Sequence, residues 1–196
     1  GNKFLKKALK EKLFSFSSDI KDIYLSKINI ICLGTPIDEF LNPRYNLLVD
    51  TINMLSSKLK KSHHLVIRST VFPGTTNFIY KLLNRKNKKI KLTFFPERFV
   101  QGFAIDEFNK FPHIIGSVNK ESERECKKFL KIFGNEIITM KPEEAEITKL
   151  FLNSYRYVQF SIANQFYKIA VSANLDYEKI NYALKHNYKR GDIPSP

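Results

Sequence analysis

Short apolar runs alternate with segments of helical periodicity along the first two thirds of the chain. The runs are rich in Ile and Leu, and several end at Gly or Pro, which is typical of buried strands. The predicted strands cover residues 27–33, 64–71, 90–95, 113–117 and 136–140. Helices are predicted where apolar residues recur every three or four positions, at 45–59, 75–83 and 122–133. Strands that alternate with helices over such short intervals predict an α/β fold with a parallel sheet.

The pattern changes after residue 141. Pro142 opens a helix whose first turns carry acidic residues, where the helix dipole favours them. Nothing interrupts this helix until about Asn174, and a shorter helix at 177–186 follows. One side of the long helix is an apolar stripe suited to a core or to a partner helix. The stripe consists of Phe151, Tyr155, Val158, Ile162, Phe166 and Ile169. We therefore expect a sheet domain at 1–141 and a helical domain at 142–196.

Charge is the most unusual feature of the composition. The 196 residues carry 33 Lys and Arg against 19 Asp and Glu, a formal net charge of +14. Such a balance suits an anionic partner, and clustered cations would suit nucleic acid. The lysines are spread over the chain, however, and lack the interleaved aromatic residues of a base-stacking surface. A small anionic substrate is therefore favoured over RNA or DNA, with a basic nucleic-acid-binding domain as one alternative.

Neither the apolar runs nor the two cysteines indicate a membrane or secreted protein. No run approaches the length that spans a bilayer, and the Lys-rich start of the chain lacks the apolar core of a signal peptide. Cys32 lies in an apolar run, and Cys126 shares a helical stripe with Phe129 and Phe133. Both are interpreted as inert core thiols. We expect a cytoplasmic protein without membrane contact.

Three predicted strands end in loops that combine Gly or Pro with polar side chains. In an open parallel sheet, ligands collect at these carboxyl ends, where unpaired N–H groups meet anions. Each loop alone also fits ordinary turn and cap chemistry. The three together favour a site for a phosphate or a ribose. The loops are residues 34–38, 68–76 and 95–98.

Candidate catalytic groups lie in these loops and on the long helix. Glu97 follows a strand beside Arg98, so it is either half of a surface ion pair or a general base that orders a water. Thr70 offers this water a second hydrogen bond. Lys149 and Asn153 lie one turn apart, where they either belong to a solvated face or hold a developing oxyanion. The histidines have no partners at metal-ligand spacing, so no metal site is predicted.

In their order and spacing, these motifs resemble the UDP-glucose/GDP-mannose dehydrogenase family. The resemblance runs from about residue 14 to residue 196. It implies a Rossmann-like sheet whose first βαβ unit is missing, followed by the long helix of a central dimerisation domain. Residues 1–141 would then be a partial NAD-binding domain, and a homodimer would form through residues 142–174. The motifs are Gly34-Thr35-Pro36, Arg68-Ser69-Thr70-Val71, Pro73-Gly74-Thr75-Thr76, Pro96-Glu97-Arg98 with Gly102, Lys149-Leu150-Phe151-Leu152-Asn153, Tyr155-Arg156 and Ala163-Asn164-Gln165.

The family oxidises C6 of a nucleotide-linked sugar to the acid, in two hydride transfers to NAD that pass through a cysteine thioester. The resemblance implies that Thr35 and Thr70 line the NAD cleft. Thr70 and Glu97 would position the water for proton transfer and hydrolysis. Lys149 and Asn153 would bind the C6 oxygen and stabilise its negative charge.

The substrate expected from the resemblance is a UDP-sugar. Arg98 looks like the N-acetylhexosamine enzymes, where the glucose enzymes more often have Phe. UDP-N-acetylmannosamine or UDP-N-acetylglucosamine is therefore preferred, and UDP-glucose is the alternative. The residues expected to contact the substrate are Glu97, Arg98, Lys149, Asn153 and Arg156.

Two features of the family are missing from this sequence. Its seven glycines form no Gly-x-Gly, so the dinucleotide fingerprint is absent. The family's nucleophilic cysteine would follow a segment like 187–196, and the buried settings expected for Cys32 and Cys126 do not suit that role. We therefore expect catalysis from a longer parent protein and no activity from these residues alone. A non-catalytic dimerisation or nucleotide-binding module is a further alternative.

Overall fold

The computed structural model describes residues 2–34, 39, 45–85, 90–99, 102–108, 110–188 and 194. The chain divides into two compact units, Gly1–Glu146 and Ile147–Pro196. The first contains the sheet and the second is helical. The boundary falls within the first two turns of the long helix rather than at its start, because these turns pack with the sheet unit.

The sheet unit is built on a five-stranded sheet of order β1-β2-β3-β4-β5. The strands β1 (Ile28–Ile31), β2 (His64–Ile67) and β3 (Lys91–Phe94) are mutually parallel. The strand β4 (His113–Ser117) runs antiparallel to β3, and β5 (Ile137–Met140) is parallel to β4. The expected α/β fold with a parallel sheet is therefore confirmed, with an antiparallel pairing between β3 and β4 among the described strands.

The direction of β4 follows from the connection that precedes it. Two neighbouring parallel strands need a crossover, usually a helix, that carries the chain back to the start of the sheet. Between β3 and β4, the described residues contain only the short helix α4 (Ala104–Phe108). The chain therefore re-enters the sheet from the end at which β3 left it.

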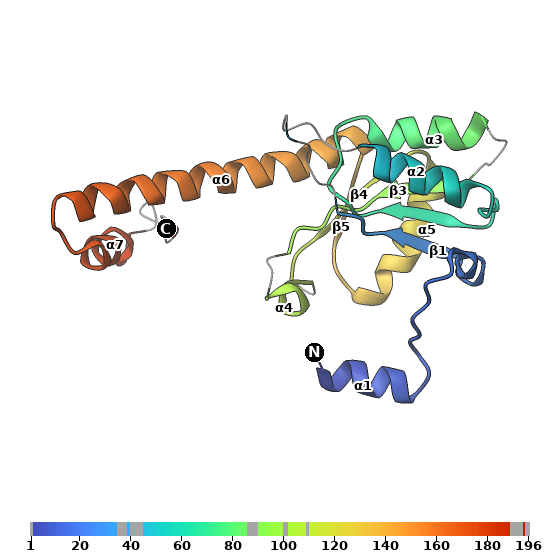
Figure 1. The fold of residues 1–196 in the computed structure, drawn as a ribbon, viewed down its shortest axis with the longest axis horizontal. Helices are drawn as coiled ribbons and strands as arrows, with labels where there is room; N and C mark the ends of the chain where they lie inside the picture. Colours follow the sequence, from blue (N-terminus) through green and yellow to red (C-terminus); the bar gives the residue numbers. More distant parts are fainter. Residues whose placement is uncertain are drawn as a thin grey trace. The chain divides into compact units, whose positions relative to one another are not determined.

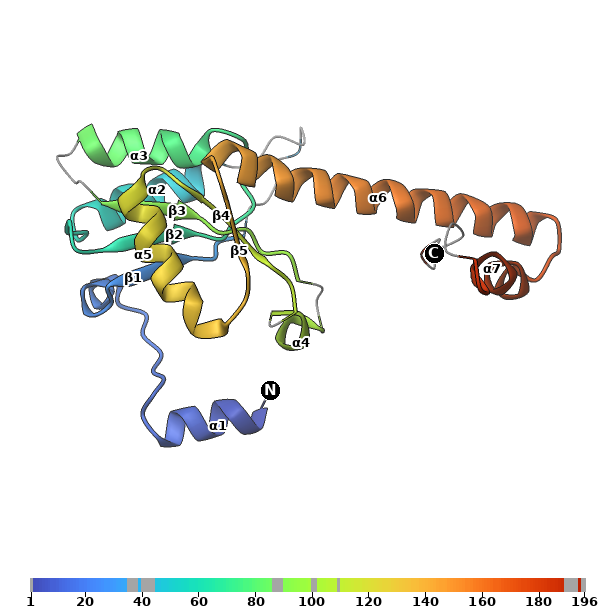
Figure 2. The same ribbon diagram turned by 180° about the vertical axis from the view of Figure 1, so that it is seen from behind.

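Helices cover both faces of this sheet. The helices α2 (Tyr45–Ser56) and α3 (Thr75–Arg85) lie on one face and α5 (Lys120–Leu130) lies on the other, as Figure 1 and Figure 2 show from opposite sides. Side chains of β2 alternate accordingly, because successive residues of a strand point to opposite faces. Leu65 and Ile67 belong to the core under α2 and α3, whereas Val66 packs with Cys126 and Leu130 of α5.

A glycine lets the long helix α6 (Pro142–Ser172) begin directly on the sheet. A Cβ atom at Gly116 of β4 would lie 2.7 Å from the Cα of Pro142 and 2.9 Å from the Cβ of Ala145. Contacts that short do not occur between real side chains and backbone, so no other residue fits here without displacement of α6. The first turn of α6 is therefore held by β4.

The remaining helices include three that the sequence patterns did not predict: α1 (Asn2–Lys10), the 3-10 helix η1 (Ile20–Leu25) and α4. A second 3-10 helix, η2 (Lys131–Phe133), extends α5, and α7 (Tyr177–Lys185) follows α6. Both helices predicted after residue 141 are therefore confirmed. In the described residues, no helix combines the length and the apolar character needed to cross a bilayer.

The apolar stripe of α6 is exposed within this chain. Its six predicted residues, from Phe151 to Ile169, have exposed fractions between 43% and 71%. In the same unit, Tyr177 of α7 is buried and its ring meets that of Tyr167 of α6, with centroids 5.4 Å apart. Contact with α7 thus covers part of α6 but leaves the stripe open.

The two cysteines differ in their surroundings. Cys126 is buried, and burial raises the pKa of its thiol to about 12, which confirms it as an inert core residue. Cys32 is exposed, so its predicted burial is wrong. It follows Ile31, which faces the core, and the next side chain along an extended chain points the other way. Burial therefore no longer argues against a reactive Cys32.

Candidate functional site

The carboxyl ends of β2 and β3 bring Arg68 beside Glu97. The strand register pairs Ile67 with Phe94, and the Phe95 N–H donates to the Ile67 carbonyl at 2.8 Å. The residues that follow the two strands therefore continue side by side. The Nη2 atom of Arg68 donates to Oε2 of Glu97 and forms an ion pair with it. The sequence suggested Arg98 as the ion-pair partner of Glu97. The partner in the structure is Arg68, which follows the adjacent strand β2.

Both carboxylate oxygens of Glu97 accept hydrogen bonds. Oε2 is held by Arg68, and Oε1 accepts the N–H of Phe99 at 2.8 Å. The side chain of Glu97 is nevertheless 44% exposed, whereas that of Arg68 is 12% exposed. Because a carboxylate offers about four acceptor positions, Glu97 can still accept a proton or a hydrogen bond from its open side.

Aromatic rings fix the guanidinium of Arg68. Its Cζ lies 4.2 Å from the ring centroid of Phe95 and 5.8 Å from that of Phe99. Such contacts with a ring face are attractive for a cation. His113 of β4 packs against the same Phe95, with ring centroids 5.3 Å apart. Burial lowers the pKa of His113, and the charge of Arg68 lowers it further, so this imidazole is neutral at pH 7.

Arg98 makes a different contact from the one its sequence position suggests. Its Nη1 donates to the carbonyl of Pro112 at 3.2 Å. Its Nε is buried and has no hydrogen-bond partner among the described residues. Arg98 therefore retains donor capacity at the edge of the site.

A carboxylate already occupies the N-terminus of α3. Oε2 of Glu146 accepts the N–H of Gly74 at 2.6 Å, and Oε1 accepts the N–H of Thr76 at 2.8 Å and its hydroxyl at 2.5 Å. Glu146 is fully buried, and desolvation raises the pKa of its carboxyl, against the lowering effect of these bonds. These N–H groups are not available to a phosphate, so the end of the 68–76 loop performs cap chemistry instead.

The predicted cofactor residues lie at the ends of the first strands. Thr70 is half-buried in the loop that follows β2. Its neighbour Ser69 accepts the N–H of Leu33 at 2.8 Å, which ties this loop to the end of β1. Thr35 lies outside the described residues.

The other predicted site residues lie on α6, in the helical unit. Lys149 and Arg156 are half-buried, and Asn153 is exposed. Lys149 and Asn153 are four positions apart and thus share one side of the helix. The sheet unit therefore carries Thr70, Glu97 and Arg98, and α6 carries the predicted oxyanion donors.

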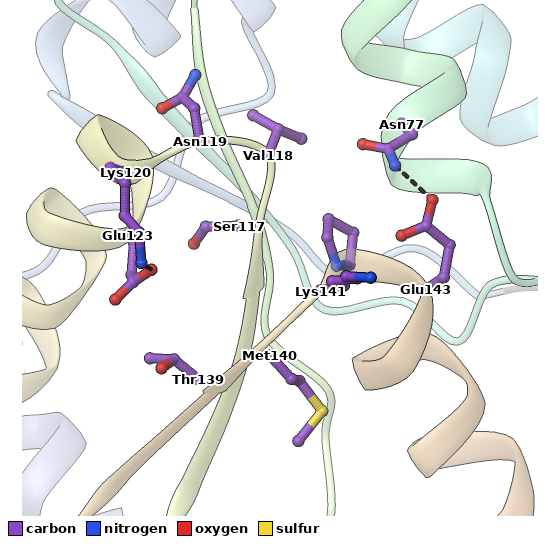
Figure 3. Close-up of a pocket in the computed structure, with 11 residues that line it drawn as sticks. Asn77, Ser117, Val118, Asn119, Lys120, Glu123, Thr139, Met140, Lys141 and Glu143 are labelled. Atoms are coloured by element: carbon purple, nitrogen blue, oxygen red, sulfur yellow. Dashed lines mark hydrogen bonds and ion pairs between the residues drawn. The ribbon is translucent and has the colours of Figure 1, made fainter.

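The sheet unit also contains a cavity of about 540 Å³ away from these residues. Figure 3 shows it between the start of α6, the start of α5 and the ends of β4 and β5. Three of its charged side chains have partners within the lining: Lys120 pairs with Glu123 at 3.1 Å, and Glu143 accepts from the amide of Asn77. None of the predicted site residues is among those that line it, which are Asn77, Ser117, Val118, Asn119, Lys120, Glu123, Thr139, Met140, Lys141, Pro142 and Glu143.

In the described part of the chain, no three His, Cys, Asp or Glu side chains gather at a spacing that could hold a metal ion. The predicted site residues provide a carboxylate, a hydroxyl, an amide and cationic side chains. Such groups can order a water, transfer a proton and stabilise an oxyanion.

Residues 2–134 match the family model described as the UDP-glucose/GDP-mannose dehydrogenase family, NAD binding domain. The chain belongs to this family. The family predicted from the motifs is therefore confirmed, and so is NAD as the family's cofactor. The match ends before α6, so it says nothing about Lys149, Asn153 or Arg156.

Named relatives extend the similarity beyond that domain. The UDP-N-acetyl-D-mannosamine dehydrogenase of Methanocaldococcus jannaschii is 34% identical over 162 residues, which are 80% of this chain and 38% of the relative. The UDP-glucose 6-dehydrogenase of Rickettsia prowazekii is 26% identical over 170 residues, 84% of this chain and 39% of the relative. The structure of UDP-D-ManNAc dehydrogenase from Pyrococcus horikoshii has a TM-score of 0.86 and 27% identity, covering 98% of this chain and 47% of that one. The chain thus spans less than half the length of these relatives.

The sequence patterns did not reveal two contacts, that of Arg68 with Glu97 and that of Glu146 with the start of α3. Arg68 was noted in the sequence only as part of a motif. It follows β2 directly, as Phe95 follows β3, so alignment of the two strand ends would have placed Arg68 beside Phe95. Glu146 was interpreted only through the dipole of its own helix. No local signal indicates that it caps a different helix, because Thr76 lies 70 positions earlier in the chain.

Proposed function

We propose that the protein carrying this chain oxidises the C6 hydroxyl of a UDP-N-acetylhexosamine to the uronic acid, with NAD as hydride acceptor. The reaction comprises two hydride transfers and passes through a thioester on a cysteine. The observation that carries the proposal is the exposed carboxylate of Glu97, held at both oxygens at the carboxyl ends of the strands. In an open α/β sheet, this edge is where ligands bind.

Glu97 and Thr70 position the water that takes part in proton transfer and in hydrolysis of the thioester. A carboxylate fixed by two donors presents its remaining acceptor positions in one direction, which orients a water well. Lys149 and Asn153 bind the C6 oxygen. An ammonium and an amide at fixed positions on a helix stabilise the negative charge that develops there far better than water does.

NAD fits the described residues in part. The hydroxyl of Thr70, half-buried after β2, suits the ribose or nicotinamide side of the cofactor, and Thr35 is assigned to the same cleft. The N-terminus of α3 does not suit the diphosphate, because Glu146 already accepts its N–H groups. When bound, NAD supplies the acceptor for the hydride from C6.

The preferred sugars are N-acetylmannosamine and N-acetylglucosamine. Support comes from Arg98, which follows Glu97 directly and resembles the N-acetylhexosamine enzymes at this position. Glu97 and Arg156 are proposed to contact the substrate as well. The 34% identical relative is named as a UDP-N-acetyl-D-mannosamine dehydrogenase. UDP-glucose remains the second candidate because the 26% identical relative is named as a UDP-glucose 6-dehydrogenase.

A homodimer through residues 142–174 is proposed for the same protein. The exposed stripe of α6 includes a shallow apolar groove of about 270 Å³, lined by Tyr157, Val158, Ser161, Ile162, Gln165 and Phe166. A face this apolar on one helix is typical of a protein interface. A second copy would present the same stripe.

The substrate is tested by NADH formation. The full-length protein is given NAD with UDP-N-acetylmannosamine, UDP-N-acetylglucosamine or UDP-glucose, and two NADH per sugar consumed are expected with an N-acetylhexosamine. The Glu97→Gln variant serves as the control for adventitious reduction. Faster turnover of UDP-glucose would transfer the proposal to the second candidate. Absence of NADH with all three sugars would refute both.

A further inference from the structure

We propose that Arg68 is a positioning residue that fixes the carboxylate of Glu97 toward the bound water, and that Phe95 and Phe99 fix Arg68 in turn. This inference rests on the proposed function for the role of Glu97. It assigns Arg68 a role through the side chain of Glu97, with which it is paired.

Arg68 and the backbone of Phe99 hold the carboxylate from two sides. Arg68 binds Oε2, and the N–H of Phe99 binds Oε1 at 2.8 Å. A carboxylate bound at both oxygens cannot rotate about its terminal torsion, which is otherwise broad. Because the side chain of Arg68 is mostly buried and that of Glu97 is nearly half exposed, the clamp lies behind the carboxylate and leaves its outer side open.

The guanidinium is itself held in place. The backbone N–H of Arg68 donates to the carbonyl of Ile31 at 2.9 Å, which continues the β1–β2 ladder. Its planar head lies over the ring of Phe95 and near that of Phe99. Phe99 therefore has two roles. Its N–H binds the carboxylate of Glu97, and its ring packs near the guanidinium of Arg68.

Other charged groups nearby do not replace Arg68. The neighbouring Arg98 directs its Nη1 to the carbonyl of Pro112. His113, which packs against Phe95, is buried and stays neutral at pH 7, because desolvation and the charge of Arg68 lower its pKa. Among the residues that the structure describes, Arg68 is thus the cation paired with Glu97.

A partly exposed ion pair adds little to the stability of a protein. Loss of the ion pair itself should therefore cost little stability, because Glu97 stays in contact with water. The side chain of Arg68 also packs over Phe95, so Arg68→Lys, which keeps most of the apolar stem, carries the test if Arg68→Ala unfolds. Misplacement of a catalytic group by about 1 Å can cost about 100-fold in rate, since the reacting geometry is lost. The expected signature is a fall in kcat with little change in KM.

The kinetic test compares Arg68→Ala, Arg68→Lys and Arg124→Ala in the full-length protein. Arg124 is an exposed arginine of α5 and provides the matched control. Arg68→Ala should lower kcat by about 100-fold and leave KM within about threefold, and added guanidinium ion should restore part of the rate. The kcat of Arg68→Lys should fall between those of the wild type and Arg68→Ala, because an ammonium can bind the carboxylate but lacks the planar head that lies over Phe95. A kcat for Arg68→Ala within about twofold of the wild type would overturn the inference.

A double variant separates positioning from an independent role. If Arg68 acts only through Glu97, the variant Arg68→Ala/Glu97→Gln should be no slower than Glu97→Gln alone. A further loss equal to that of Arg68→Ala in the wild-type background would show that Arg68 acts on its own, which contradicts the proposal.

The amide resonance of Phe99 tests the inference without turnover, so the test still applies if the proposed function is refuted. The Phe99 N–H reports the position of the carboxylate through its bond to Oε1. Its amide resonance should shift in Arg68→Ala and in Glu97→Gln, and it should stay unchanged in Arg124→Ala. An unchanged resonance in Arg68→Ala would overturn the positioning itself. A shifted resonance with normal kcat would instead overturn the catalytic role of Glu97.

Discussion

The two units of this chain differ in how far their large apolar side chains are buried. In the sheet unit, Leu65, Ile67 and Leu92 are completely buried between strands and helices of the same chain. In the helical unit, Phe151 and Tyr157 of α6 are 71% and 74% exposed. Burial of apolar area is the main favourable contribution to folding. The sheet unit therefore contains the source of its own stability, whereas the apolar face of α6 gains its contribution only when a partner covers it.

Polar groups follow the same division. The sheet unit holds buried polar groups in defined pairs, such as Glu146 with Thr76, and His64 with Thr93 at 2.9 Å. Unpaired groups in such positions are costly, so these pairs specify how the unit packs. On α6, Asn153, a proposed ligand of the C6 oxygen, is exposed instead.

The largest effect is expected for Glu146→Leu. The change leaves the N–H groups of Gly74 and Thr76 and the hydroxyl of Thr76 without their acceptor in a buried place. Each unsatisfied group costs roughly 1 kcal/mol or more, so the free energy of unfolding should fall by about 3 kcal/mol. Urea unfolding at pH 7 measures the difference.

Glu121→Leu is the control for Glu146→Leu. Glu121 is exposed in the first turn of α5, and the effect of its substitution should stay within about 0.5 kcal/mol. Equal midpoints for the two variants would mean that the cap on α3 does not stabilise the sheet unit.

A smaller effect is expected from the titration of His64. Burial lowers its pKa from 6.5 to about 4, the charge of Lys91 lowers it as well, and Glu125 acts in the opposite direction. Below pH 6.5 the unfolded chain binds a proton that the folded chain does not bind, so stability decreases as the pH falls toward 4. Between pH 7 and pH 4.5, His64 should account for a loss on the order of 2–3 kcal/mol.

His64→Asn tests this by removing the titration while keeping a polar group near Thr93. Its unfolding free energy should decline less steeply with acid than that of the wild type. Some decline should persist, because burial also lowers the pKa of His113. A wild-type slope in His64→Asn would contradict the prediction.

The smallest effect on the sheet unit is expected for Val158→Asp. Val158 lines the apolar groove of α6, and a carboxylate there should be desolvated by a second copy and weaken the homodimer by about tenfold or more. The thermal stability of the sheet unit itself should not change. Sedimentation equilibrium of the full-length protein measures the dimer, with Asn164→Asp on the opposite side of α6 as the control. Equal dissociation constants for the two variants would exclude this face as the interface.

The sequence predicted those parts of the fold that depend on local periodicity. Ile and Leu runs located every strand of the sheet, and the alternation of strands with helices indicated the α/β class. The direction of β4 and the exposure of Cys32 were not predictable in this way. Direction depends on where a connection returns the chain, and an apolar run does not show which of its side chains face the core.

The same limit applies to the candidate site. Glu97 was found because its position at a strand end is visible in the sequence, but neighbours in sequence suggested Arg98 as its partner. The actual partner, Arg68, lies 29 positions away and is brought close by the register of β2 and β3. Contacts between distant segments are set by packing, so they require the structure.

In the proposed function, side chains of the sheet unit position the water and side chains of α6 bind the oxyanion. The variant Lys149→Ala tests this assignment most directly. Turnover of the preferred UDP-sugar by the full-length protein is compared among the wild type, Lys149→Ala and Lys168→Ala, a control for an exposed lysine of the same helix. Loss of the oxyanion donor should lower kcat by about 100-fold to 1,000-fold, and the control should retain it. Near-normal turnover by Lys149→Ala would contradict the proposal and reduce this side of α6 to a solvated face.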